Sequence, residues 1–122
     1  MAKFESFEEI KSWQKARFFN KRLYETIESS ATFKKDFDLG RQIKRASISI
    51  SSNIAEGFER NTDKELVYFL YVSKASASEV RSQLYLAFDL NYITKNDFDE
   101  LFTEVSDISK LISGFIKYLN KS

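Results

Sequence analysis

Apolar residues recur at three- and four-residue steps along most of this chain, which is the spacing of helices that each bury one face. Short polar segments separate these periodic stretches. The pattern predicts an all-α protein in which a single domain, residues 1–122, forms an antiparallel up-and-down four-helix bundle. The expected helices span about residues 6–29, 39–60, 62–91 and 94–119.

One stretch departs from simple helical periodicity. Residues 47–51 alternate serine and isoleucine, as a strand would. We interpret the stretch as helical, because its flanks continue one helical stripe. Serine side chains are small, so the backbone of a neighbouring helix can approach this helix closely. The stripe consists of Leu39, Ile43, Ala46, Ile50, Ile54 and Gly57.

The third expected helix is apolar on two sides. It begins with a capping box, Thr62 followed by Glu65, and Thr94 is expected to cap the fourth helix. A helix that is apolar on most sides is buried on most sides, and a single four-helix bundle does not bury two faces of one helix well. The pattern therefore predicts a homo-oligomer. One sector contains Leu66, Leu70, Ala77, Val80, Leu84 and Phe88, and the other contains Val72, Ala75, Leu86 and Leu90.

Polar residues on the second and third helices are the first candidate site. They lie on the side of these helices that faces away from the predicted core. Ile48 and the small serines on that side indicate that it packs against another surface. Glu79 falls in the second apolar sector, where a carboxylate must be paired or protonated. We predict a structural polar network; the alternative is that Glu79 acts as a general acid or base. The network comprises Arg45, Ser49, Ser52, Asn53, Glu56, Arg60 and Glu79.

The chain contains neither cysteine nor histidine. This removes disulfides, thiolate ligands and the commonest general base. The acidic group Asp97, Asp99 and Glu100 lacks the spacing of a calcium loop. We therefore expect no enzyme activity, no metal site and no cofactor. Since the sequence contains neither a signal peptide nor a run of about 18 apolar residues, we expect a cytoplasmic protein that does not bind membranes.

Positive charge gathers in the first part of the chain, although the net charge is only +1. Residues 1–45 carry a net charge of +4 and residues 46–122 carry −3. This asymmetry fits a polyanion partner, and it fits equally well complementary faces of identical subunits. Phe18, among these cations, can stack on a base or contact another subunit. The candidate nucleic-acid contacts are Lys11, Lys15, Arg17, Lys21, Arg22, Arg41, Lys44 and Arg45.

The middle of the chain carries a specific motif. Residues 52–58, which read SNIAEGF, are followed by Arg60, Tyr68, Phe69, Leu70, Ala75, Ser76, Glu79, Gln83 and Leu84. In this order and spacing, over about residues 40–93, the chain resembles the four-helix-bundle proteins called 23S rRNA-intervening sequence proteins. The resemblance implies a short bacterial protein that is homopentameric. It also extends to the accessory protein of diversity-generating retroelements, which binds nucleic acid and a reverse transcriptase.

The residues and the resemblance together predict a non-enzymatic oligomer that is associated with RNA. The retroelement accessory proteins look far more basic than this chain, whose net charge is +1. We therefore expect RNA binding that is weak, independent of sequence and dominated by phosphates. The alternative is a structural scaffold that binds a protein partner and makes no contact with nucleic acid.

Overall fold

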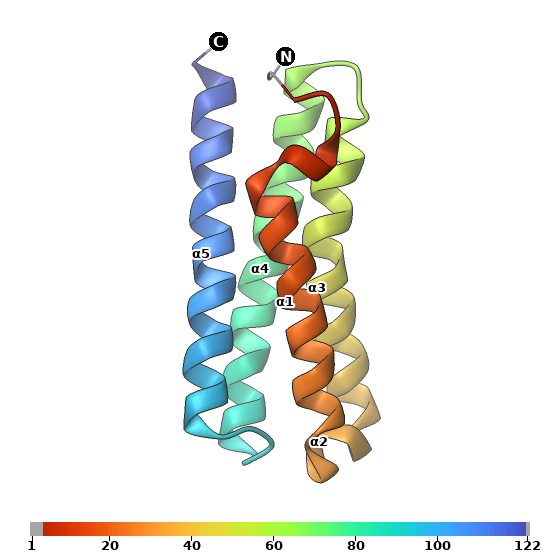
Figure 1. The fold of residues 1–122 in the computed structure, drawn as a ribbon, viewed down its shortest axis with the longest axis vertical. Coiled ribbons are helices and arrows are strands. Elements are labelled where there is room, and N and C mark those ends of the chain that lie inside the picture. Colours follow the sequence, from red (N-terminus) through yellow and green to blue (C-terminus); the bar gives the residue numbers. More distant parts are fainter. Residues whose placement is uncertain (1–3, 122) are drawn as a thin grey trace.

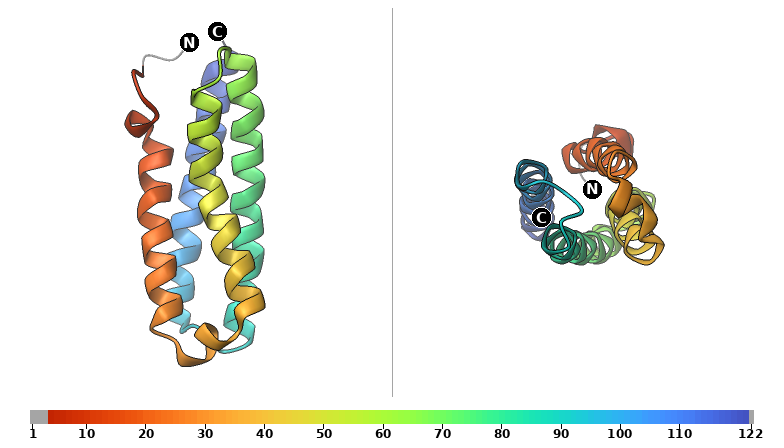
Figure 2. Two further views of the ribbon diagram at one scale, coloured as in Figure 1. Left: turned by 90° about the vertical axis from the view of Figure 1, so that its right-hand side faces the viewer. Right: turned by 90° about the horizontal axis from the view of Figure 1, so that it is seen from below.

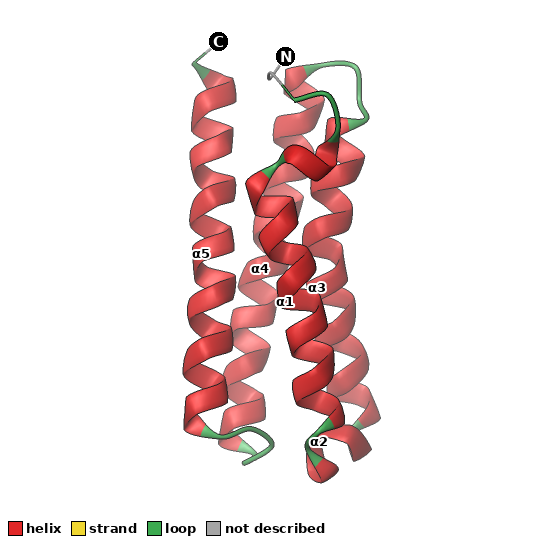
Figure 3. Cartoon of the chain, in the orientation of Figure 1, coloured by secondary structure: helices red, strands yellow, loops and turns green. Residues whose placement is uncertain are grey.

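The computed structural model describes residues 4–121, and every regular element in that range is helical (Figure 3). This confirms the predicted all-α helical bundle. Four long helices account for most of the chain, with one short helix between the first two of them. The bounds are Phe7–Glu9 for the 3-10 turn η1, Lys11–Glu28 for α1, Ala31–Lys35 for α2, Phe37–Phe58 for α3, Asp63–Asp89 for α4 and Lys95–Asn120 for α5.

The long helices lie side by side around one core (Figures 1 and 2). α3 packs against α1 and α4, and α5 packs against α4 and α1, so that each long helix has two neighbours. The start of α1, the end of α5 and the α3–α4 connection lie at one end of the bundle, whereas α2 and the α4–α5 connection lie at the other (Figure 1). None of the described helices is long and apolar enough to cross a membrane.

Each long helix contributes one apolar stripe to the core. Burial of an aliphatic or aromatic side chain stabilises the fold by about 1.5–3 kcal/mol, so these stripes dominate the stability of the bundle. Phe33 of α2 is also fully buried and closes one end of the core. The fully buried residues of the long helices include Phe19, Leu23, Ile43, Ile50, Ile54, Leu66, Leu70, Leu84, Leu101 and Ile108.

The beginning of the chain differs from the prediction of a helix from about residue 6. Residues Phe7–Glu9 form a 3-10 turn, and Ile10 is extended, with φ −75° and ψ 122°. The side chain of Ile10 is buried, so the change of direction places it in the core. For this reason α1 begins only at Lys11.

The segment expected to connect the first two helices contains a helix of its own, α2. Ser30 caps it by accepting a hydrogen bond at Oγ from the backbone N–H of Phe33, at 3.2 Å. Asp36 then caps α3, because its carboxylate accepts from the N–H of Leu39 at 3.1 Å. α3 consequently begins at Phe37, before the predicted residue 39.

The predicted caps of the last two helices are confirmed. Oγ1 of Thr62 accepts from the N–H of Glu65 at 3.2 Å, and Oγ1 of Thr94 accepts from the N–H of Asp97 at 3.0 Å. A side-chain oxygen at this position satisfies a backbone donor that the first turn of a helix leaves free.

α3 and α4 approach each other closely, as the small residues of α3 predict. A Cβ atom built at Gly57 would lie 2.7 Å from Cβ of Phe69 and 3.0 Å from Cδ1 of Leu66. Farther along the pair, the hydroxyl of buried Ser73 donates to the carbonyl oxygen of Ile50 at 2.7 Å. Glycine and serine therefore permit a backbone separation that larger side chains would prevent.

Candidate nucleic-acid interface and polar network

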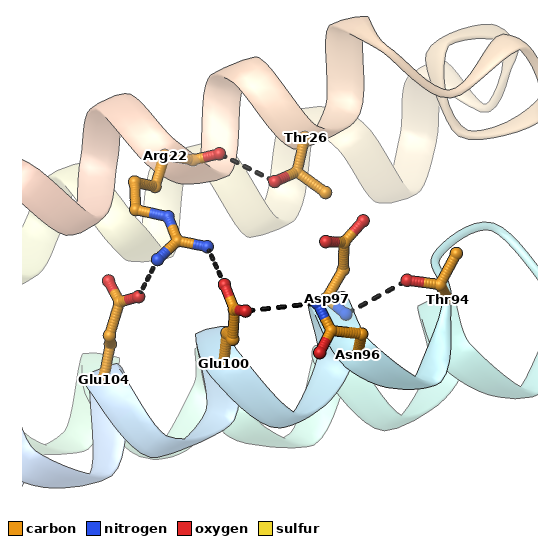
Figure 4. Close-up of polar contacts among 7 residues, drawn as sticks. All are labelled: Arg22, Thr26, Thr94, Asn96, Asp97, Glu100 and Glu104. Atoms are coloured by element: carbon orange, nitrogen blue, oxygen red, sulfur yellow. Dashed lines mark hydrogen bonds and ion pairs between the residues drawn. The ribbon is translucent and has the colours of Figure 1, made fainter.

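Seven of the eight candidate cations fall into two groups, and Arg22 belongs to the group on the α5 side of α1. Its Nη2 atom lies 2.7 Å from Oε1 of Glu100, and its Nη1 atom contacts Glu104 (Figure 4). The hydrogen bond between Arg22 and Glu100 raises the pKa of the guanidinium and holds the pKa of that carboxyl below its ordinary value. Carboxylates of the same chain thus engage Arg22 and balance its charge.

Lys15 lies on the same flank of α1. Together with the exposed ring of Phe18 it lines a pocket of about 240 Å³, whose other side carries Glu104 and Asp107 of α5. Lys11 precedes Lys15 by four residues and so shares this side of the helix. Acidic residues of α5 therefore balance the positive charge here, and a polyanion would meet both signs.

The second group lies where α1 and α3 adjoin. Nζ of Lys44 sits 4.7 Å from the centroid of the Tyr24 ring, which places α3 cations next to α1. Lys21 precedes Tyr24 by three residues, and Arg17 precedes Tyr24 by seven. Both cations therefore share the side of α1 that carries Tyr24. On α3, Arg41 precedes Lys44 by three residues. We call Arg17, Lys21, Arg41 and Lys44 the α1–α3 basic face.

The members of the α1–α3 basic face have no carboxylate partner within the part of the chain that the structure describes. Beneath them the two helices are joined by an amide, because Asn20 accepts a hydrogen bond from Ser47 at 2.5 Å and donates one to Ser51 at 3.1 Å. Arg45 is exposed as well. These helices thus hold a cluster of available cations on a rigid support.

The predicted polar network is present only in pieces. Oγ of Ser49 lies 2.9 Å from Oγ of Ser76, and the amide of Asn53 donates to the carbonyl and to the hydroxyl of Ser49, both at 2.8 Å. At the end of α3, Nε of Arg60 lies 3.5 Å from Glu56. Each piece is local to the α3–α4 contact or to one turn of helix.

Glu79 does not join these pieces, which corrects the expectation that it is buried and paired. Its side chain is exposed, and its one hydrogen-bond partner among the described residues is Gln83, at 3.1 Å. Arg45 and Ser52 are exposed, and within residues 4–121 neither forms a hydrogen bond or ion pair with Glu79. The physical reason is that the second apolar sector of α4 faces outward from the single chain, with 47% of Leu86 and 45% of Leu90 accessible.

Residues 8–114 match the sequence model of the 23S rRNA-intervening sequence protein family. The chain belongs to this family. It is also similar to the crystal structure of a protein of unknown function from the S23 ribosomal protein family of Bacteroides thetaiotaomicron VPI-5482. The TM-score is 0.81 at 24% identity, over 87% of this chain and 95% of that chain, so the likeness shows the fold. No curated protein matches the sequence significantly.

The family motif SNIAEGF occupies the end of α3, where its residues pack in the core and against α4. Ile54 is fully buried in the core, and Gly57 allows the close approach of α4. The ring of Phe69 meets the guanidinium of Arg60, with 4.9 Å between the ring centroid and Cζ. The motif thus encodes the α3–α4 contact.

Sequence reasoning missed a polar corner at the opposite end of α3. Asn91 adopts a positive φ of 61° and ends α4, with N–H groups of Asn91 and Tyr92 bonded back to Phe88 and Ala87. This turn brings the hydroxyl of Tyr92 to Asp36, to which it donates at 2.8 Å. The asparagine after the helix is the only local sign of this turn in the sequence. The hydrogen bond could not be predicted from a local pattern, because Asp36 and Tyr92 are 56 residues apart.

The hydrogen bonds at this corner change two pKa values. Bonds from the N–H of Leu39 and from Tyr92 hold the pKa of Asp36 below its ordinary value, and the carboxylate in turn raises the pKa of Tyr92. Asp36 therefore stays ionised at neutral pH. Within residues 4–121, no group of three or more acidic side chains is placed to hold a metal ion.

Proposed function

We propose that this family member is a non-enzymatic, RNA-associated protein that works in the cytoplasm as a homo-oligomer. The observation that carries the proposal is the α1–α3 basic face, whose cations lack carboxylate partners among the described residues. Phosphates are the ligand that such a cluster fits, because neutralising them releases condensed counterions. The family's description names an intervening sequence of 23S rRNA, which makes RNA the polyanion that we propose.

The binding is weak and independent of sequence. The net charge of the chain is +1, and the acidic residues of α5 balance the other flank of α1. Each phosphate contact to a single strand contributes about 0.7 to the slope of log affinity against log salt, so four contacts predict a slope of about −3. An oligomer repeats the basic face on every subunit, and avidity then strengthens the weak contacts.

The outer surface of α3 and α4 is the proposed subunit contact of an up-and-down bundle. Leu86 and Leu90 of α4, one turn apart, are 47% and 45% accessible, and Ile48 of α3 is exposed as well. Large apolar side chains that lie exposed one turn apart are typical of a protein interface. We propose that a second copy of the chain covers this surface, and the family resemblance implies a ring of five.

The RNA proposal is tested by a charge-reversal pair. We expect wild type to bind labelled single-stranded RNA at low salt and to release it at physiological salt. Arg17→Glu/Lys21→Glu removes two contacts and lowers the salt slope by about 1.4. The control Lys110→Glu/Lys117→Glu reverses two exposed lysines of α5, so it makes the same change in net charge elsewhere on the surface. Equal loss in both pairs, or no wild-type binding at low salt, would overturn the proposal.

The assembly is tested separately by light scattering. Wild type should show a multiple of 14.3 kDa, and Leu86→Glu/Leu90→Glu should reduce that mass. Tyr118→Glu, at an exposed aromatic of α5, should leave it unchanged. A wild-type mass of 14.3 kDa would remove the oligomer from the proposal.

The second candidate is a scaffold that binds a protein partner. Two exposed tyrosines of α4, Tyr68 and Tyr71, favour it, because tyrosine is enriched in protein interfaces. This function requires no nucleic acid. It takes precedence if wild type assembles as expected but binds no RNA at low salt.

A further inference from the structure

A pocket of about 340 Å³ opens where the end of α1, α2 and the start of α3 meet. Ile27 and Phe33 supply its apolar floor. Gly40 also lines it, and a Cβ atom built there would meet no atom within 4 Å. The volume falls in the range of about 300–1,000 Å³ that is typical of small-ligand sites. Here α3 leaves a hollow where any other residue would place a side chain.

Three cations surround this corner pocket, and two of them are available to a ligand. Nζ of Lys34 lies 3.5 Å from Glu28, so this ammonium already has a carboxylate partner. Lys44 rests against the ring of Tyr24, which positions its charge without neutralising it. Arg41 is exposed and has no carboxylate or ring partner among residues 4–121. Lys44 follows it by one turn of α3, so the two charges stand together.

Two carboxylates line the same pocket, and both are engaged. Glu28 faces Lys34, as described above. Asp36 accepts hydrogen bonds from the N–H of Leu39 at 3.1 Å and from the hydroxyl of Tyr92 at 2.8 Å. Asp36 keeps its negative charge, because both donors are neutral. With Glu28 paired to Lys34, the two cations Arg41 and Lys44 outweigh the one carboxylate Asp36, so the pocket has a net positive charge.

An exposed aromatic ring completes the corner. Phe37 lines the pocket, yet 73% of it is accessible to solvent. It precedes Arg41 by four residues and so lies on the same side of α3. Proteins that bind single-stranded nucleic acid combine such rings, which stack on bases, with cations that follow the phosphates.

We propose that this corner pocket binds one nucleotide of single-stranded RNA. The base stacks on Phe37 and reaches into the hollow at Gly40, and the phosphate lies between Arg41 and Lys44. The proposal rests on the RNA association proposed above and adds a preference for single strands, because a paired base remains in its helix and cannot reach the ring. A free nucleoside monophosphate has the same chemistry but lacks the further phosphates that would reach Lys21.

The experiment compares three probes: a labelled single-stranded RNA, the same RNA annealed to its complement, and adenosine monophosphate as a competitor. Phe37→Ala should weaken binding of the single strand by about 5- to 150-fold, the range found for loss of one stacking ring. Gly40→Leu should weaken it as well by filling the hollow. Neither change should affect binding of the duplex.

Two matched controls accompany these variants. Phe18→Ala removes another exposed ring, and Gly114→Leu alters another helix glycine whose Cβ would meet nothing within 4 Å. Both should bind the single strand as wild type does. Circular dichroism and light scattering confirm that each variant keeps its fold and its mass.

The outcomes separate this proposal from the one it rests on. If wild type binds RNA and Phe37→Ala and Gly40→Leu behave like the controls, the pocket is not the site, and the association through the basic face stands. If wild type binds no RNA at low salt, both proposals fall.

Equal affinity for duplex and single strand overturns the nucleotide pocket. So does a change in oligomeric mass on Phe37→Ala, which would assign the ring to a subunit contact. Adenosine monophosphate that binds as tightly as the RNA assigns the pocket to a free nucleotide instead.

Discussion

The two ends of α3 each carry a glycine, and the surroundings of these glycines are opposite. At Gly57 a Cβ atom would lie 2.7 Å from Cβ of Phe69, so α4 closes this end completely. At Gly40 a Cβ atom would meet nothing within 4 Å, so the other end is open. Glycine inside a helix costs about 1 kcal/mol relative to alanine. Close packing offsets that cost at Gly57, and no packing does so at Gly40.

Glycine thus occupies two kinds of position in α3, one closely packed and one open. The closed end lies in the family motif and joins α3 to α4, so its role is structural. The open end borders the corner pocket, where Arg41 and Phe37 are exposed.

The largest effect is expected at the closed end. Gly57→Ala should lower the free energy of unfolding by about 1–3 kcal/mol, because the added methyl group overpacks the α3–α4 contact. Cβ of Phe69 lies at the root of its side chain and cannot move without the α4 backbone. Urea unfolding measures the change. An unchanged or higher stability would show that the two helices have room to separate.

The same substitution at the open end should have the opposite sign. Gly40→Ala should raise the free energy of unfolding by about 0.5–1 kcal/mol, since alanine restricts the unfolded chain and meets no clash. Gly114→Ala in α5, which also has open space, is the matched reference and should give a similar gain. A loss at Gly40 beside a gain at Gly114 would contradict the contrast between the two ends.

Acid should weaken the open end through Asp36. Because hydrogen bonds lower its pKa in the folded protein, its contribution is present above its ordinary pKa and is lost as the pH falls through the folded-state value. Asp36→Asn should therefore be less stable than wild type at pH 7, and the difference should shrink towards about pH 3. Glu100, whose pKa is lowered too, remains in both proteins, so comparing them isolates Asp36. Urea unfolding at both pH values provides the test, and a constant difference would refute it.

The smallest effect is expected at Glu79, which belongs to neither end. Its side chain is exposed and bonds only to Gln83 among the described residues, so Glu79→Ala should change the free energy of unfolding by less than about 0.5 kcal/mol. The measurement belongs at protein concentrations below those at which chains associate. A loss near 3 kcal/mol would instead restore the buried, paired carboxylate that the sequence pattern predicted.

The helices and much of their capping could be predicted from the sequence alone. The apolar stripe through Ile43, Ile50 and Ile54 and the caps at Thr62 and Thr94 depend on residues within one or two turns of each other. Local backbone geometry decides such features, so a linear pattern is enough to predict them. The motif that identified the family was also readable, because it encodes contacts of two consecutive helices.

The hydrogen-bond and ion-pair partners of the predicted site residues depend on the tertiary structure and could not be predicted from the sequence. Arg22 meets Glu104 from 82 positions away, and Tyr92 meets Asp36 from 56 positions away. Glu79 faces solvent in the described chain although its neighbours in sequence are apolar. Helical periodicity gives the direction of a side chain around its own axis, but not the residue that stands opposite on the next helix. The rotation and offset of packed helices set that residue, and with it the difference between the closed end at Gly57 and the open end at Gly40.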